Sequence, residues 1–389
     1  MKLLQNMKLA LGGLLVAGLA ACGGGGGGSA DSGTLRLALT DAPACGYDAV
    51  NVTIEKVRVH QSSSASDADG GWSEVVLNPA RRVNLLDLQN GVLEELGETP
   101  LPAGKYTQLR LVLAGNTGAN PLANSVVLTS DKSELALKTP SGQQSGLKTN
   151  INIDIAANQL ADFVLDFDAC KSVVLAGGSG QYLLKPVVTV IPNYVSGVAG
   201  FVDAAIVANG YTNVSLQQAG LVIKATTPDS TGKFLLRPVA PGSYTLVMTA
   251  PGRTTAVVTN VAVVADTVTT VNASGTPLNP PVSGSGTVTG TAPVDTLVRV
   301  LQPLTNGTTV EVAGRFVDGI TGSYSYSLPV DAPRVAPYVA APNLLVFAPD
   351  TAAAGKYTLN ASLTGFADKT VTLAALTSAP AITTNITVP

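Results

Sequence analysis

The chain has 389 residues, of which 46% are apolar and 13% charged, and its formal net charge is −3. This length allows two to four domains, and so apolar a chain with so few charges is not disordered as a whole. A weak negative charge without a basic run argues against a nucleic-acid partner, because binding to phosphates depends on Lys and Arg. The single histidine, His60, leaves no multi-histidine metal centre. We therefore expect no metal and no cofactor, and an enzyme is the most remote alternative.

The first 22 residues have the layout of an export signal. Lys2 and Lys8 precede an apolar run from Leu9 to Leu19, which is shorter than the ~20 residues of a membrane-spanning helix. The run ends in Leu19-Ala20-Ala21-Cys22, which resembles the lipobox of bacterial lipoproteins. The resemblance implies lipid attachment at Cys22 and the membrane as a partner. The alternative is an ordinary cleaved signal with a chance cysteine.

Residues 23–33 are expected to be a flexible tether. Six consecutive glycines, Gly23 to Gly28, offer no side chains to bury and behave as a coil. Gly rather than Asp follows the cysteine. In Gram-negative lipoproteins an Asp there tends to retain the protein at the inner membrane, so the resemblance implies the outer membrane.

Residues 34–193 are predicted to form the first β domain. Apolar and polar residues alternate at Leu35–Leu39, Val50–Ile54, Leu109–Leu113, Ile151–Ile155 and Phe163–Phe167. A period of two predicts half-buried strands. The alternation slips after Ile54, which predicts a β-bulge near Glu55-Lys56. Residues 85–96 form the one helix-like patch.

Particular strings in this region carry a family resemblance. They are Leu35-Arg36-Leu37-Ala38-Leu39-Thr40-Asp41-Ala42-Pro43, Val50-Asn51-Val52-Thr53-Ile54 and Ala103-Gly104-Lys105-Tyr106. Together they resemble the bacterial envelope family called domain of unknown function 4382, over roughly residues 33–192. The family brings no known activity with it.

Two further domains are predicted at 196–275 and 287–389, joined by a linker at 276–286. They look like an internal repeat, because Pro241-Gly242-Ser243-Tyr244-Thr245-Leu246 is echoed by Ala354-Gly355-Lys356-Tyr357-Thr358-Leu359. The pattern resembles the carboxypeptidase-regulatory-like β-sandwich, a small prealbumin-like fold, closely in the first copy and in degenerate form in the second. The second copy carries an insertion around Pro333–Pro349. The predicted fold is all-β, with three β-sandwich-like domains in tandem.

The turn glycine and the tyrosine of this repeat have structural interpretations. Gly242 is expected to take a positive φ, and Tyr244 to start a strand and cover the core. An exposed ligand platform is the lesser alternative for Tyr244.

Cysteine and carboxylate pairs provide the other candidate sites. Cys45 and Cys170 are predicted to form a disulfide, with two free thiols as the alternative. The sequence Asp67-Ala68-Asp69-Gly70 only faintly resembles a calcium loop, because it lacks the later Glu. Asp166 and Asp168 share one expected strand face, at a spacing found in glycosidases, but acidic pairs on solvated strands are common.

Three classes of function remain open, of which an enzyme is the most remote. The leading prediction is a non-catalytic cell-envelope lipoprotein that displays its β-sandwich modules as a scaffold, adhesion or interaction element for envelope proteins. The alternative is a carbohydrate-binding lipoprotein, for which glycans would need exposed aromatic rings. The candidate rings are Trp72, Tyr324, Tyr326 and Tyr338.

Overall fold

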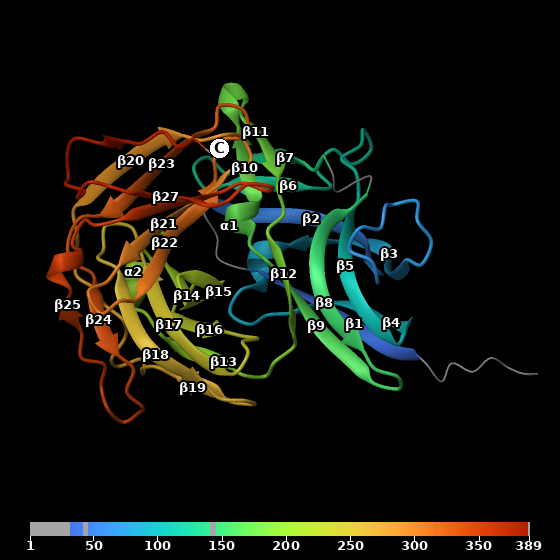
Figure 1. Ribbon diagram of the computed structural model, residues 1–389, viewed down its shortest axis with the longest axis horizontal. Coiled ribbons are helices and arrows are strands. Elements are labelled where there is room, and N and C mark those ends of the chain that lie inside the picture. The colour runs from blue at the N-terminus through green and yellow to red at the C-terminus, as the bar shows by residue number, and fades with distance from the viewer. Residues whose placement is uncertain (1–31, 42–45, 141–144, 388–389) are drawn as a thin grey trace, which may run out of the picture.

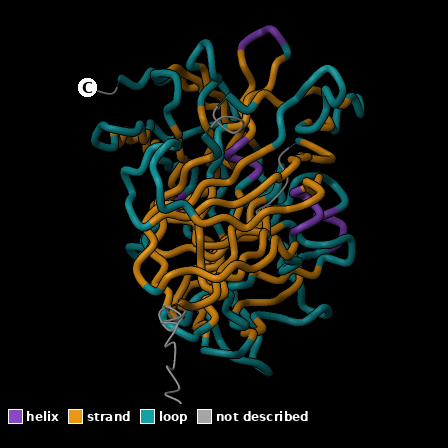
Figure 2. Tube along the Cα trace, turned by 90° about the vertical axis from the view of Figure 1, so that its right-hand side faces the viewer, coloured by secondary structure: helices purple, strands orange, loops and turns teal. Residues whose placement is uncertain are grey.

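The protein is built almost entirely of β-strands, as a computed structural model shows (Figures 1 and 2). The structure describes residues 32–41, 46–140 and 145–387. The strands form several separate sheets, and the helices are single turns. The predicted all-β fold is confirmed.

The first module consists of a four-stranded sheet in the order β12-β9-β1-β4 and a larger sheet in the order β10-β11-β7-β6-β2-β5-β8, with β3 paired to β2. One apolar cluster fills the space around these sheets and includes Leu37, Val52, Leu111 and Phe167. The elements of this module are β1 (Ser32–Asp41), β2 (Tyr47–His60), β3 (Ser73–Asn84), η2 (Leu85–Leu88), β4 (Glu94–Pro102), β5 (Gly104–Leu113), β6 (Ser125–Leu128), β7 (Glu134–Lys138), β8 (Leu147–Ile155), β9 (Leu160–Phe167), α1 (Ala169–Ser172), β10 (Val173–Ala176), η3 (Gly177–Ser179), β11 (Gln181–Leu184) and β12 (Val188–Pro192).

Each alternating segment predicted in this region lies within a strand. The predicted bulge is also confirmed, because β2 shifts register between Ile54 and Lys56 against both of its partners in that part of the strand, β3 and β5. The helix-like patch is wrong. Only Leu85–Leu88 forms a 3₁₀ turn, and from Glu94 the chain is β4 because its backbone pairs with β1.

The second module has a three-stranded sheet in the order β16-β13-β19 packed on a larger sheet that begins β15-β14-β17-β18. Val198, Phe234, Leu246 and Val258 are in the core between them. Its elements are β13 (Gly197–Phe201), α2 (Ala204–Val207), β14 (Asn213–Gln218), β15 (Leu221–Thr226), β16 (Lys233–Leu236), β17 (Gly242–Thr249), β18 (Ala256–Val263) and β19 (Val268–Thr270).

The third module repeats this plan with sheets ordered β23-β20-β28 and β22-β21-β26-β27. Its core includes Val288, Val300, Tyr326 and Leu359. Its elements are β20 (Ser285–Thr291), β21 (Leu297–Pro303), β22 (Thr309–Phe316), β23 (Ser323–Pro329), β24 (Arg334–Pro337), β25 (Ala348–Pro349), η4 (Thr351–Ala353), β26 (Thr358–Ser362), β27 (Lys369–Thr372) and β28 (Ile382–Thr383).

The insertion of the third module completes the sheet of the second. Strand β24 pairs in parallel with β18, from Ala256↔Arg334 to Thr259↔Pro337, and β25 pairs with β24. Leu345 and Phe347 of the same insertion pack against the core of the second module. The two modules therefore share a sheet as well as a peptide linker.

The repeated turns correct one expectation and support another. Gly242 does not take a positive φ, because it already belongs to β17 and pairs with Val263. Gly355, its counterpart in the second copy, does take a positive φ (+63°), and so do Gly232 (+85°) and Gly322 (+67°) just before β16 and β23, where a Cβ would lie 1.9 and 2.1 Å from a backbone oxygen. Tyr244 is a core residue as expected, with 6% of its surface exposed and its hydroxyl donating to Ala240 O at 2.9 Å.

Candidate functional site

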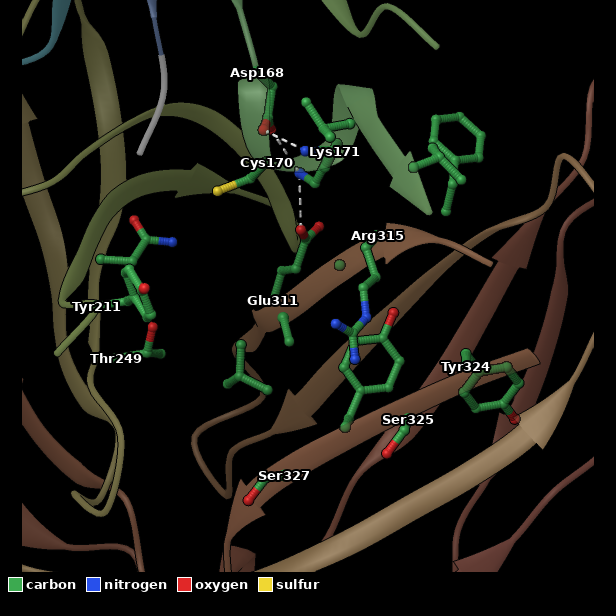
Figure 3. Close-up of a pocket in the computed structure, with 18 of the residues that line it drawn as sticks. Asp168, Cys170, Lys171, Tyr211, Thr249, Glu311, Arg315, Tyr324, Ser325 and Ser327 are labelled. Atoms are coloured by element: carbon green, nitrogen blue, oxygen red, sulfur yellow. Dashed lines mark hydrogen bonds and ion pairs between the residues drawn. The ribbon is translucent and has the colours of Figure 1, made fainter. Parts of the chain in front are cut away.

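A cavity of about 740 Å³ lies where the three modules meet. In Figure 1, α1 of the first module lies at this junction, beside the strands of the third. The first module contributes α1 and β10 to the lining, the second contributes Tyr211 and part of β15, and the third contributes β22 and β23 (Figure 3).

One wall of this junction pocket is a chain of charged groups. Lys171 Nζ lies 3.4 Å from Asp168 Oδ2 and 3.0 Å from Glu311 Oε1, and the other Glu311 oxygen lies 3.4 Å from Arg299 (Figure 3 shows the Lys171 pairs). Burial lowers the pKa of Lys171, but Asp168 and Glu311 outweigh it, so that the pKa is raised overall. Lys171 is therefore a fixed cation that joins the first and third modules.

The same wall ties the second module to the third. The Gln217 side chain donates from Nε2 to Glu311 O at 2.8 Å and accepts from Glu311 N at 2.7 Å. The buried side-chain amide of Gln217 thus pairs with both the N–H and the C=O of Glu311 in β22.

The opposite wall consists of β23 and the end of β22. Arg315 is exposed, its guanidinium lies 4.9 Å from the Tyr326 ring centre, and no ion pair involves it among the residues that the structure describes. Ser323, Ser325 and Ser327 are exposed on β23, and Ser325 and Ser327 line the pocket in Figure 3.

The two tyrosines between these serines are not the exposed rings that were expected. Tyr324 and Tyr326 are each 5% exposed and belong to the core of the third module. Their hydroxyls donate to Thr384 O and Val298 O, and burial raises the pKa of Tyr324 to about 12. The strand alternates, so the serines face outward and the rings face the core.

The other two candidate rings lie away from the pocket. Trp72 is half-buried, the guanidinium groups of Arg58 and Arg110 lie 4.6 and 4.7 Å from its ring centre, and its Nε1 donates to Ser66 O. Tyr338 is half-buried against the core of the second module. The two arginines and His60, whose ring centre lies 5.0 Å from that of Trp72, cover part of the Trp72 ring.

A second, deeper contact joins the first two modules. Lys224 Nζ lies 2.6 Å from Asp166 Oδ1, and these side chains are 2% and 8% exposed. Burial raises the pKa of Asp166 although Lys224 opposes the shift. The expectation of a solvated acidic strand face is therefore wrong, because the second module covers it.

Asn90 provides further contacts between these two modules. It follows the Leu85–Leu88 turn and accepts from Leu235 N at 3.1 Å, while its own N–H donates to Thr226 Oγ1 at 2.9 Å. Its side-chain amide also donates to Thr227 O at 3.0 Å.

Asp318 and the glycine after it hold the third module to the first. Asp318 accepts from Gly177 N at 2.9 Å, and Gly319 N donates to Leu175 O at 2.9 Å. Burial raises the pKa of Asp318, but hydrogen bonds from Thr321 and its neighbours outweigh burial and lower it. Asp318 therefore stays ionised and holds both loops.

Of the three cysteines, only Cys170 lies in the described residues, where it lines the junction pocket. Cys22 and Cys45 lie outside them, so the lipid site and the Cys45–Cys170 disulfide stay predictions. The flanking residues support the pairing: Asp41, the last residue of β1, accepts from Ala169 N at 3.0 Å and so holds the end of β1 beside α1.

The faint calcium loop has other roles. Asp67 pairs with Arg58, and Asp69 accepts from Ser66 N at 2.8 Å. Within the described ranges, no group of three or more His, Cys, Asp or Glu side chains has the arrangement to hold a metal ion. No helix in that part of the chain is long and apolar enough to cross a membrane.

Two family models match the chain in the order that the sequence predicts. Residues 32–186 match the domain of unknown function (DUF4382), and residues 202–275 match the carboxypeptidase regulatory-like domain. The protein is thus a multi-module β protein. The order of the two matches, DUF4382 and then the carboxypeptidase regulatory-like domain, is the predicted one. No curated protein sequence matches it.

Similar solved structures are distant. A cohesin–X-dockerin complex from Acetivibrio cellulolyticus shares 24% identity over 22% of this chain and 58% of that chain, with a TM-score of 0.20. A streptococcal ancillary pilin shares 11% identity over 92% of this chain and 99% of that one, with a TM-score of 0.16. The Corynebacterium diphtheriae major pilin shares 9% over 91% and 99%, also with a TM-score of 0.16. Scores this low carry no information about function.

Proposed function

We propose that this protein is a non-catalytic, lipid-anchored protein of the bacterial cell envelope whose three β modules act as one rigid interaction element. The anchor rests on the resemblance of Leu19–Cys22 to a lipobox, with the acyl chains on Cys22. The tether expected at 23–33 is shorter than that, because Ser32 and Gly33 already belong to β1 and pair with β4. The outer membrane is the proposed location.

The observation that carries this proposal is the buried Lys224–Asp166 pair between the first two modules. Modules joined by linkers move relative to one another unless their interface is extensive. Among the described residues, Lys224 and Asp166 are each other's only ion-pair partner at this buried position, so the pair fixes how the two modules sit against each other rather than adding much net stability. A fixed junction suits display of a shaped surface better than flexible spacing.

Contacts of the third module support the same conclusion. Strand β24 adds to the sheet of the second module, and Glu311 binds Gln217 of that module. Glu311 also pairs with Lys171 of the first module, and Asp318 accepts from Gly177 of the first module. Each module therefore touches both others, which removes the bending expected of a string of domains.

Fractionation tests the anchor. The Cys22→Ala variant should lose labelling by a palmitate analogue and leave the carbonate-washed membrane, whereas Cys170→Ala should keep both properties. Membrane retention with unchanged labelling in Cys22→Ala would contradict the anchor.

Site-specific photocrosslinking tests the interaction role. A photoreactive residue at position 325 in intact cells should give adducts with envelope proteins, and the same residue at the exposed Lys356 is the matched control. Adducts with polysaccharide alone would support the carbohydrate-binding alternative. Turnover of a glycoside or ester panel by the purified protein, lost on changing Glu311, would support an enzyme instead.

A further inference from the structure

Strand β23 is an unpaired sheet edge that faces the junction pocket. It is the first strand in the order β23-β20-β28, so it has a neighbour on one side only. Its residues Ser323 to Ser327 line the pocket. An open edge offers a row of backbone donors and acceptors to any extended chain that reaches it.

The hydrogen-bond pattern shows which backbone groups of β23 are free. On β20, Thr289 O accepts from Thr384 N and Thr291 O accepts from Ile386 N, so these residues turn their backbone groups toward β28. Ser325 and Ser323 lie opposite them in the antiparallel pair. Because opposed residues in a non-hydrogen-bonded pair both point outward, the peptide groups of Ser323 and Ser325 point away from β20.

The same alternation places the Ser327 peptide groups outward. Asp318 N already donates to Ser323 O, which closes one end of the edge. Over Ser325–Ser327, no backbone or side-chain partner occupies the outward groups within the described residues. The part of the edge with free backbone groups is therefore Ser325–Ser327.

Two other edge positions of the protein are already occupied. The edge of β18 is covered by β24, and Gln217 fills the Glu311 position of β22. The first case shows that a four-residue extended segment is enough to add to a sheet of this chain.

The surroundings of the β23 edge favour a polypeptide over a glycan. The rings of Tyr324 and Tyr326 are buried, so they offer no stacking plane. Arg315, beside the edge, is an exposed cation without an ion-pair partner in the described residues. The cavity volume of about 740 Å³ lies within the range of ligand sites.

We propose that the junction pocket binds an extended segment of a partner protein, which adds as a strand along Ser325–Ser327 and places an acidic side chain on Arg315. Main-chain hydrogen bonds would supply affinity, and the acidic residue would supply selectivity. The inference deepens the proposed interaction role and names the partner's chemistry.

A synthetic peptide tests the proposal on the chain from Ser29 onward, which keeps every residue of the described fold. The probe is acetyl-Thr-Val-Glu-Val-Thr-amide carrying a fluorophore, titrated by polarisation and by amide NMR. The expected result is saturable binding with shifts centred on the amides of Ser325 and Ser327. Two versions N-methylated on alternate residues block one peptide edge each, so one should bind and the other should not.

Paired changes on both partners test the acidic contact. Replacing the peptide glutamate with glutamine should weaken binding roughly tenfold. Arg315→Gln should weaken the glutamate peptide to the same degree and leave the glutamine peptide unchanged, while Lys356→Gln should affect neither. Ser325→Pro removes an N–H that faces the pocket and pairs with nothing in β20. It should abolish binding at an unchanged melting temperature.

Several results would overturn the proposal. One is that the peptide shows no saturable binding, and another is that both methylated peptides bind equally well. A third is that Ser325→Pro loses stability while Arg315→Gln still binds the peptide normally. Shifts at Ser325 caused by acidic oligosaccharides but not by peptide would make the pocket a glycan site. Protection of Ser325 only on self-association would make the occupant a second copy. None of these outcomes depends on the anchor, so failure of the Cys22 experiment remains separate.

Discussion

Replacing Lys224 with methionine is the sharpest test of the rigid junction. At 2.6 Å and an effective dielectric constant of 20, the attraction between Lys224 and Asp166 is about 6 kcal/mol. Taking both ions out of water costs several kcal/mol each, so the intact pair contributes little net stability. Lys224→Met removes the attraction and leaves Asp166 buried. We expect a loss of about 3–5 kcal/mol at pH 7, measured by urea denaturation.

The dependence on pH gives the loss a second signature. Burial already raises the pKa of Asp166, and without Lys224 the pKa rises further. A carboxyl group with a raised folded-state pKa contributes stability below its unfolded pKa and loses it as pH rises. The deficit of Lys224→Met should therefore shrink in acid.

Two matched variants complete the experiment. Lys224→Met with Asp166→Leu should restore stability to within about 1 kcal/mol of the original protein or exceed it. Lys185→Met breaks another lysine–aspartate contact between modules, but Asp295 is 62% exposed there, so we expect about 0–1 kcal/mol. Equal losses for the two lysine variants, with no rescue in the double variant, would refute the reasoning.

Three further predictions concern a buried tyrosine, a buried aspartate and the disulfide. Tyr244→Ala should destabilise the protein by about 3–5 kcal/mol, because a large buried ring is lost, whereas Tyr244→Phe should cost about 1 kcal/mol for its hydrogen bond to Ala240; calorimetry compares them. Burial and the nearby Asp168 raise the pKa of Asp41, so its contribution to stability declines from about pH 4 upward, and Asp41→Asn should flatten that decline in melting temperature. Non-reduced peptide mapping should find Cys45 linked to Cys170, and two alkylatable thiols in the native protein would exclude the link.

Local patterns were enough to predict the strands, because burial on one face of a sheet leaves a period of two in the sequence. The Leu35–Leu39 alternation and the bulge after Ile54 are examples. Gly242 was misjudged because its turn resembles a tight loop, while backbone pairing to Val263 makes it the first residue of a strand. Gly355, at the same place in the second copy, is not paired in a strand and takes a positive φ.

Contacts between modules left little signal in the sequence. Lys224 and Asp166 are separated by 58 residues, and each by itself resembles an ordinary surface charge. The insertion around Pro333–Pro349 was recognised by its length, but its addition to β18 depends on the three-dimensional proximity of two modules. Tyr324 and Tyr326 are candidate rings by residue type alone, whereas the serine–tyrosine alternation at 323–327 places both rings on one face of a strand.

The addition of β24 to β18 has a consequence for the order in which the chain matures. Thr259 and Pro337 are paired partners, so the sheet of the second module stays incomplete until the growing polypeptide has passed position 337. During that interval β18 is a bare, Val-rich edge of the kind that joins neighbouring nascent chains into aggregates. A chain truncated between β19 and β24 would keep this vulnerability permanently, and the insertion acts as a built-in protector that arrives late in synthesis.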